Sequence, residues 1–169
     1  MIGLRETPAK LGFFSPAVLI ASFGGSGLIR PASGSWGSLA GLGAGLALLH
    51  FISAETMLLA AVLAYFAGFW ACTKWLAAIA ADTAADKDPQ AIVIDEVAGL
   101  WIALAFAPAT PLGYGAAFLL FRFFDITKIW PANWADRSLP GAHGIMLDDV
   151  FAGCWAAIFL VIGRATQIL

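Results

Sequence analysis

The chain alternates long apolar stretches with short polar segments. Because a helix rises about 1.5 Å per residue, roughly 20 apolar residues are needed to span the hydrocarbon core of a bilayer. Residues 36–52, 56–81 and 150–162 are candidate spans. Residues 11–23 are also apolar, but Pro16 interrupts them, and we expect a retained interfacial or re-entrant helix there.

The apolar region 97–124 is the ambiguous part of this pattern, because Pro108 and Pro111 divide it. Proline breaks the helical hydrogen-bond ladder, so the region is either one kinked span or a hairpin of two helices that turns at residues 107–113. A single span would place the charged segments before and after it on opposite sides of a membrane. A hairpin places them on one side, as the positive-inside tendency favours. We therefore predict the hairpin, with the charged loops facing the cytoplasm.

Composition supports a membrane protein. Hydrophobic residues make up 61% of the chain and charged residues 12%, whereas soluble domains average about 45–50% and 25%. A soluble domain of 169 residues has too much surface for its volume to hide that much apolar area. The predicted fold class is all-α, a polytopic membrane helical bundle of about five apolar helices plus the N-terminal interfacial helix, as one domain over residues 1–169. The net charge of −2 and the lack of a basic run do not suggest a nucleic-acid partner.

The acidic residues are unevenly spread, and nine of the eleven fall between Asp82 and Asp149. A charge at membrane depth is expensive and usually marks function. The alternative is a solvated loop, which fits Asp82 and Asp86 best. Asp95 and Glu96 interrupt an apolar run, and we expect them in the first turn of a helix, where the helix dipole favours carboxylates.

A second acidic pair, Asp148 and Asp149, precedes the last apolar stretch. We expect this pair to open the final helix, where one of the two could be the N-cap. Together with Asp95 and Glu96 it could form an oxygen-rich cage. Such a cage suits Mg²⁺, which prefers carboxylates, waters and substrate phosphate.

Basic and small residues could supply an anion site. Arg122 and Asp125 are three residues apart and can share a helical face, with Lys128 roughly in line; a juxtamembrane ion pair is the alternative. Residues 24–38 are rich in Gly and Ser, so backbone N–H groups could approach an anion just before a helix N-terminus. A flexible loop is the alternative there, and a P-loop is excluded because the Gly-Lys-Ser/Thr ending is absent.

The chain lacks the nucleophiles of several phosphatase classes. Its two histidines are His50 and His143, and His50 lies in an apolar stretch toward the far side of the predicted bundle. Neither Cys72 nor Cys154 is followed by the arginine of a cysteine phosphatase, and no DxDxT/V sequence occurs. The remaining acids, cations and small residues fit metal-assisted phosphoryl transfer to water.

Four ordered motifs carry a family resemblance. They are PASGSWGSL at 31–39, DPQAIVIDE at 88–96, FRFFDITK at 121–128, and a segment at 136–149 that begins Asp-Arg and ends Gly-Ile-Met-Leu-Asp-Asp. Together they resemble phosphatidylglycerophosphatase A, from about residue 23 to residue 153. The family usually has Ala-Pro-Gly-Thr where this chain has Ala-Ser-Gly-Ser at 32–35, and often Lys-Pro at 128–129 where this chain has Lys-Ile.

The resemblance implies an all-helical fold with a central helix surrounded by others, in a protein of the bacterial inner membrane. Together with the charge pattern, this predicts a multi-pass protein whose active site faces the cytoplasm. It implies Mg²⁺-dependent removal of the terminal phosphate from phosphatidylglycerophosphate, giving phosphatidylglycerol in phospholipid biosynthesis. Two rival functions remain open. One is a small cation-binding transporter that uses the same acids, and the other is a non-catalytic membrane scaffold.

We predict three overlapping sets of site residues. The expected metal ligands are Asp88, Asp95, Glu96, Asp148 and Asp149. The expected catalytic residues are Asp95, Glu96, Arg122, Asp125, Lys128 and Asp149. The expected phosphate-binding residues are Ser33, Gly34, Ser35, Ser38, Arg122, Lys128 and Arg137.

Overall fold

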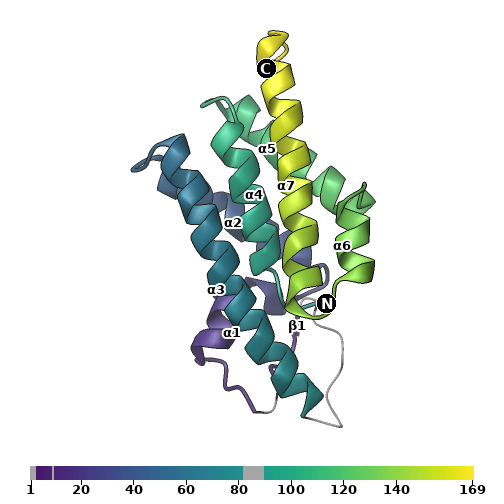
Figure 1. The fold of residues 1–169 in the computed structure, drawn as a ribbon. Helices are drawn as coiled ribbons and strands as arrows, with labels where there is room; N and C mark the ends of the chain where they lie inside the picture. Colours follow the sequence, from purple (N-terminus) through teal and green to yellow (C-terminus); the bar gives the residue numbers. More distant parts are fainter. Residues whose placement is uncertain (1–2, 9, 82–89) are drawn as a thin grey trace.

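Seven α-helices account for most of the chain that the computed structural model describes, namely residues 3–8, 10–81 and 90–169 (Figure 1). In chain order they are α1 (Pro16–Ala21), α2 (Ser33–Leu49), α3 (Ala54–Ala80), α4 (Ile94–Phe106), α5 (Pro111–Thr127), α6 (Ala132–Ser138) and α7 (Ala142–Ala165). A 3-10 turn, η1 (Ser26–Leu28), and an antiparallel ribbon of β1 (Gly3–Leu4) with β2 (Ile29–Arg30) precede α2. The predicted predominance of helix is confirmed.

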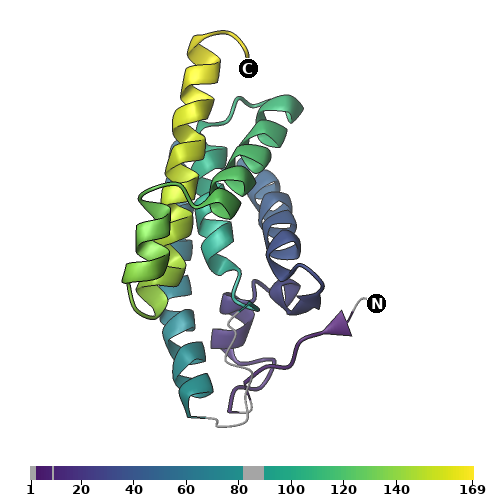
Figure 2. The same ribbon diagram turned by 90° about the vertical axis from the view of Figure 1, so that its right-hand side faces the viewer.

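The central helix of the bundle is α4, which contacts α2, α3, α5 and α7. Its side chains at Val97, Leu100 and Leu104 are completely or almost completely buried. Figure 1 shows α4 between α3 and α7, and Figure 2 shows α7 on one side of it and α2 on the other. The arrangement implied by the family resemblance, a central helix surrounded by others, is present.

The backbones of α4 and α7, which run in the same direction (Figure 1), touch where they cross. A Cβ atom on Gly99 would lie 2.3 Å from the carbonyl oxygen of Asp149, and one on Gly153 would lie 2.3 Å from the carbonyl oxygen of Gly99. Asp95 precedes Gly99 by four residues, and Asp149 precedes Gly153 by four. Because four residues make about one helical turn, the crossing places both carboxylates at the same interface.

The region divided by prolines forms a helical hairpin, so the alternative of one kinked span is wrong. Ala107, which precedes Pro108, has an extended backbone and ends α4. Pro111 occupies the first turn of α5, where its missing N–H is not needed, and the Thr110 side chain accepts a hydrogen bond from the Gly113 N–H at 3.0 Å.

Several helix boundaries differ from the sequence prediction. The last helix begins at Ala142 rather than near residue 150, so Asp148 and Asp149 lie inside α7 and neither is its N-cap. The apolar and small residues between Ala142 and Asp148 continue the helix, and Gly141, with a φ of 62°, precedes it. Within the apolar stretch 11–23, only the six residues of α1 are α-helical. The helix begins at Pro16, because proline has no N–H to donate inside a helix. The short helix α6 was not predicted.

Two helices, α3 and α7, are long and apolar enough to cross a membrane by length and composition. The outer surface of α3 exposes large apolar side chains, including Leu59, Leu63 and Phe66. The N-termini of α2, α4 and α7 lie toward one end of the bundle, and the α2–α3 and α4–α5 connections lie toward the other (Figure 1). Because α4 and α5 form a hairpin, the residues that flank it return to the same end, as the sequence predicted.

We predict that Gly99→Ala destabilises the fold, because its methyl group cannot fit against the α7 backbone. Overpacking of this kind typically costs about 1–3 kcal/mol. Gly43→Ala is the matched control, since a Cβ atom there meets nothing within 4 Å and alanine is the better helix former. Thermal unfolding in one detergent should show a lower midpoint for the first variant alone. Equal midpoints would contradict the close crossing.

Candidate functional site

Arg122 joins three helices at one end of the bundle. Its Nη1 donates to Ser38 Oγ on α2 at 3.1 Å and to Glu96 Oε1 on α4 at 3.1 Å. The same nitrogen contacts Asp125 Oδ2, one turn along α5, at 2.5 Å. The side chains of Arg122 and Glu96 are only 17% and 13% exposed, so water screens this ion pair weakly. The predicted pairing of Arg122 with Asp125 on one helical face is confirmed.

Ser38 completes this network from a fully buried position. Its hydroxyl donates to Glu96 Oε2 at 2.8 Å and accepts from the Arg122 guanidinium. Because a buried polar group is normally hydrogen-bonded, the hydroxyl keeps both partners. It thereby fixes the Glu96 carboxylate and the Arg122 guanidinium relative to each other. Ser38 was predicted to bind phosphate. In the structure its hydroxyl instead lies between Glu96 and Arg122 and supports both.

Lys128 forms a second charged group just beyond the end of α5. Its backbone is left-handed, with a φ of 46°, and its Nζ contacts the Asp148 carboxylate and lies 3.6 Å from Asp136 Oδ1. Burial alone would lower the pKa of Lys128, but the Asp148 carboxylate outweighs that effect and raises the pKa. Lys128 is therefore a cation at any physiological pH.

Asp95 and Asp149 differ from the other acids of the site, because within the described ranges neither forms an ion pair. The Asp95 carboxylate accepts the Glu96 backbone N–H at 3.0 Å, and Asp149 is 3% exposed. Each interacts electrostatically with the other and with the three acids Glu96, Asp125 and Asp148. The site therefore holds five carboxylates beside two cations, Arg122 and Lys128.

These five carboxylates have the chemistry that a hard divalent cation requires, because oxygen ligands and excess negative charge favour Mg²⁺. Among the residues that the structure describes, no group of three or more acidic, histidine or cysteine side chains surrounds a single point as a metal cage would. The acids thus gather at one interface without forming a preassembled cage in that part of the chain. Asp88, a predicted ligand, lies outside the described residues, as do Asp82 and Asp86.

A cleft of about 280 Å³ opens beside the Arg122–Glu96 pair. Its lining residues are Ala32, Ser33, Gly34, Ser35, Gln90, Ile92, Glu96 and Arg122. The last part of the predicted small-residue segment 24–38, from Ser33 onward, is here the start of α2, which no side chain caps. The first N–H groups of a helix have no intrahelical acceptor and carry its positive dipole end, so this turn favours an anion.

Gly34 shapes this cleft, because a Cβ atom there would lie 2.2 Å from Glu96 Oε1. A larger residue at this position would therefore displace the Glu96 carboxylate. The structure therefore brings the predicted residues Ser33, Gly34 and Ser35 together with Arg122 and Glu96. The serine and glycine segment is more than 50 residues away from either partner in the sequence.

The residues predicted to bind phosphate and those that line the cleft are not the same set. Arg137 lies exposed on α6 and does not line the cleft. Gln90 does line it and accepts a hydrogen bond from the Arg5 guanidinium, which the N-terminal ribbon brings near. Sequence reasoning missed both residues, because Gln90 is uncharged and Arg5 is 85 positions away from it.

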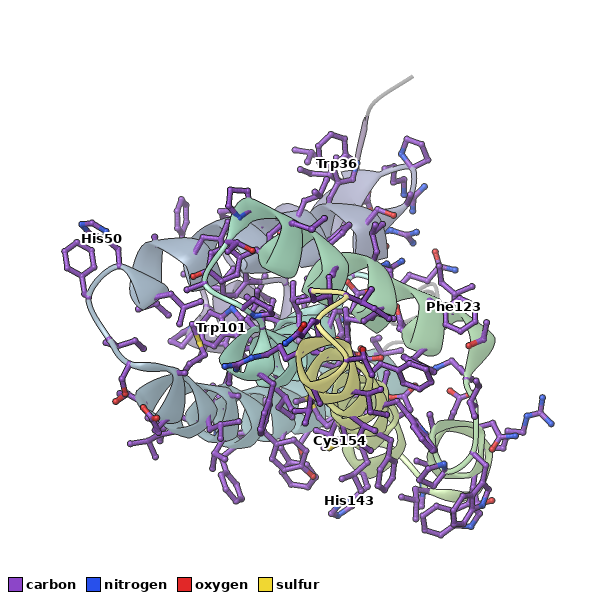
Figure 3. All side chains as sticks on the ribbon, turned by 90° about the horizontal axis from the view of Figure 1, so that it is seen from above. Trp36, His50, Trp101, Phe123, His143 and Cys154 are labelled. Atoms are coloured by element: carbon purple, nitrogen blue, oxygen red, sulfur yellow. The ribbon has the colours of Figure 1, made fainter. Side chains whose placement is uncertain are left out.

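Both histidines lie on the outside of the bundle, on different sides, as Figure 3 shows. His50 packs against Phe51, and the His143 ring lies 4.6 Å from that of Phe69. Neither histidine lines the cleft. A histidine nucleophile is therefore not positioned there, in agreement with the sequence argument.

Comparison with known proteins agrees with these motifs. The phosphatidylglycerophosphatase A family model matches residues 19–164. A Haemophilus influenzae protein named phosphatidylglycerophosphatase A is 40% identical over 153 residues, which cover 88% of this chain and 89% of the relative. An Escherichia coli protein of the same name is 35% identical over 153 residues, or 88% of this chain and 84% of the relative.

A third relative, from Bacteroides thetaiotaomicron, is provisionally named phosphatidylinositol-3-phosphatase. It is 36% identical over 155 residues, which cover 87% of this chain and 92% of the relative. No solved structure matches the chain significantly.

We predict that Arg122→Gln destabilises the fold, because it leaves Glu96 and Asp125 without their cation. Hydrogen bonds to charged groups contribute about 1.5–3 kcal/mol each. Arg137→Gln removes the same charge from an exposed position on α6 that forms no ion pair with the described residues, and should leave stability unchanged. Chemical unfolding of both variants checks the difference, and similar losses would argue against the three-helix network.

Proposed function

The chain belongs to the phosphatidylglycerophosphatase A family, and from this premise we propose that it hydrolyses the terminal phosphomonoester of phosphatidylglycerophosphate. The products are phosphatidylglycerol and inorganic phosphate, as in phospholipid biosynthesis. The observation that carries the proposal is the cleft in which the first turn of α2 faces Arg122. Backbone N–H groups and a guanidinium on one cavity are a phosphate-binding combination.

The reaction makes two demands on the residues beside this cleft. A bond forms between a water oxygen and phosphorus, and the bond from phosphorus to the glycerol oxygen breaks. One proton therefore leaves the water and one reaches the glycerol oxygen. A carboxylate of the acidic group that does not hold the metal can accept the water proton, and Glu96 is the member of this group that lines the cleft.

Negative charge that develops on the phosphate oxygens must also be stabilised. Arg122 can donate to these oxygens from a guanidinium already held in place by Ser38 and Glu96. The N–H groups at the start of α2 add donors whose positions are fixed by the helix. Donors fixed before the reaction are effective because they need no reorganisation in the transition state.

We propose Mg²⁺ as the cofactor, held chiefly by Asp95 and Asp149 with help from Glu96, Asp148 or Asp88. The excess of carboxylates over cations supports this proposal. A bound Mg²⁺ would neutralise charge on the phosphate oxygens and help to orient the attacking water.

We also propose that residues 1–169 form one multi-pass domain of five apolar helices in the bacterial inner membrane, with the cleft at the cytoplasmic side. The shared core of α1, α3, α4, α5 and α7 supports a single domain. Trp36, Trp130 and Trp134 are exposed on the segments near the charged end, and indole rings favour the membrane interface. The 24 residues of α7 extend about 36 Å, about 6 Å more than the roughly 30 Å hydrocarbon core, so its first turn can lie at the membrane surface.

The Bacteroides relative supports a second candidate substrate, a phosphatidylinositol 3-phosphate. Its phosphate is also a monoester on a lipid head group, so the same donors could bind it. The two candidates differ in the group that carries the phosphate, a glycerol or an inositol ring.

We predict that the purified protein releases inorganic phosphate from phosphatidylglycerophosphate in detergent when Mg²⁺ is present. EDTA should abolish the release, and added Mg²⁺ should restore it. Parallel assays with phosphatidylinositol 3-phosphate compare the two head groups under identical conditions. Release from the inositol lipid alone would replace the proposed substrate, and undiminished release in EDTA would overturn the metal dependence.

We predict that Asp149→Asn lowers kcat by about 10²–10³, the loss typical of removing one group that stabilises a transition state. Its unfolding temperature should stay the same or rise, because the substitution relieves repulsion among the buried acids. Glu55→Gln is the control, since Glu55 is exposed in the first turn of α3 at the other end of the bundle. Full activity of Asp149→Asn would remove this residue from the proposed site.

A further inference from the structure

A second cavity lies between α2 and α5, farther along the same two helices that carry the phosphate cleft. Its volume is about 560 Å³, and it is open rather than enclosed. The lining residues are Leu42, Leu46, Leu49, His50, Pro111, Tyr114 and Gly115. We name this cavity the α2–α5 groove. Its walls are mainly apolar, whereas five of the eight residues that line the phosphate cleft are polar or charged.

The groove exists because α2 packs closely on α4 but not on α5. Gly41 and Gly45 face α4, where Cβ atoms would lie 3.0 Å from the Val97 side chain and 2.6 Å from that of Leu104. The Trp101 indole, which points toward α2 in Figure 3, donates to the Gly41 carbonyl at 2.9 Å. The leucines of α2 that line the groove follow these glycines on the adjoining helical face, which α5 leaves uncovered.

The groove and the cleft follow one another along the same two helices. The Arg122–Ser38 hydrogen bond joins α5 and α2 at the cleft. From Ser38, Leu42 is four residues and Leu49 eleven residues along α2, or about 6 Å and 16 Å at 1.5 Å per residue. On α5, Gly115 precedes Arg122 by seven residues, about 10 Å. Both helices therefore lead from the phosphate site into the groove, and Figure 2 shows the start of α5 near the end of α2.

We propose that the α2–α5 groove binds one acyl chain of the lipid whose phosphate occupies the cleft. This inference rests on the proposed function and adds a site for the other end of the same substrate. Three features favour an acyl chain. The walls are apolar, the groove begins about 6 Å from Ser38, and its far end is about 16 Å away, close to the half-thickness of a roughly 30 Å hydrocarbon core. From Gly34 at the phosphate cleft to Leu42 at the start of the groove is eight residues, about 12 Å, which leaves space for the head-group glycerol, the phosphodiester and the backbone glycerol that join the terminal phosphate to the chain.

Gly115 offers a direct test, because a Cβ atom there meets nothing within 4 Å although the residue lines the groove. Gly115→Trp should therefore place an indole in the groove. Gly43→Trp is the matched control, since Gly43 has equally open space, lies inside helix α2 and does not line the groove. Each variant places the same side chain on a helix.

The experiment compares a long-chain substrate with a short-chain analogue that carries the same head group. We expect Gly115→Trp to lower kcat/KM for the long-chain lipid at least about tenfold, since losing two or three buried methylenes has that effect. The value for the short-chain analogue should be unchanged, and Gly43→Trp should change neither. An equal loss on both substrates, or no loss on either, would overturn the groove as an acyl site.

A measurement independent of catalysis separates this inference from the proposed function. Phosphatidylglycerol with a photoreactive group in one acyl chain is cross-linked to the protein in nanodiscs, and the labelled peptides are identified. We expect labelling of residues 42–50 and 111–115 that Gly115→Trp removes and Gly43→Trp retains. Labelling confined to α3 and α7 would overturn the acyl site, whereas failure to release phosphate from either substrate would overturn the proposed function alone.

Discussion

The backbone contact between α4 and α7 is the constraint on which the site depends. Because Gly99 and Gly153 let the two helices touch, the acids one turn before each glycine share an interface. Asp95 and Asp149 would repel each other there in a medium of low dielectric constant. Such a pair is unfavourable unless a positive charge lies nearby. The same packing that stabilises the bundle thus concentrates carboxylates at its charged end.

The protein's own cations neutralise only some of these carboxylates. Arg122 neutralises two of the acids, because it forms ion pairs with Glu96 and Asp125. Lys128 does the same beside Asp148. The inner carboxylates have no cation among the residues that the structure describes. A site that is rigid but electrostatically incomplete suits a ligand with separate positive and negative parts, such as a divalent ion bound together with a phosphate.

Sequence patterns predicted those parts of the structure that depend on local chemistry. The break at Pro108 and Pro111, the pairing of Arg122 with Asp125, and the position of Asp95 in the first turn of a helix all follow from residues close together in the chain. The start of α7 did not follow, because residues 142–149 mix small, apolar and acidic side chains that a helix and a loop both accept.

Other parts of the site depend on tertiary contacts and could not be predicted in this way. Gln90 lines the cleft because the chain before α4 passes the first turn of α2, and its neutral side chain carries no distinctive signal. Ser38 was expected to contact phosphate, but its burial between Glu96 and Arg122 depends on how three helices meet. Comparison with relatives named the family, whereas the geometry shows which members of its motifs meet.

The helices around the cleft are short, and in the proposed bilayer placement this has a consequence for the membrane itself. The 17 residues of α2, the 13 of α4 and the 17 of α5 extend only about 25, 20 and 25 Å, less than the hydrocarbon thickness. Lipids on this side must thin or tilt to match, at a fraction of a kcal/mol per Å of mismatch. Hydrophobic mismatch would then draw the head groups of one leaflet inward, toward the level of Arg122, so that the bilayer deforms to meet the phosphate site.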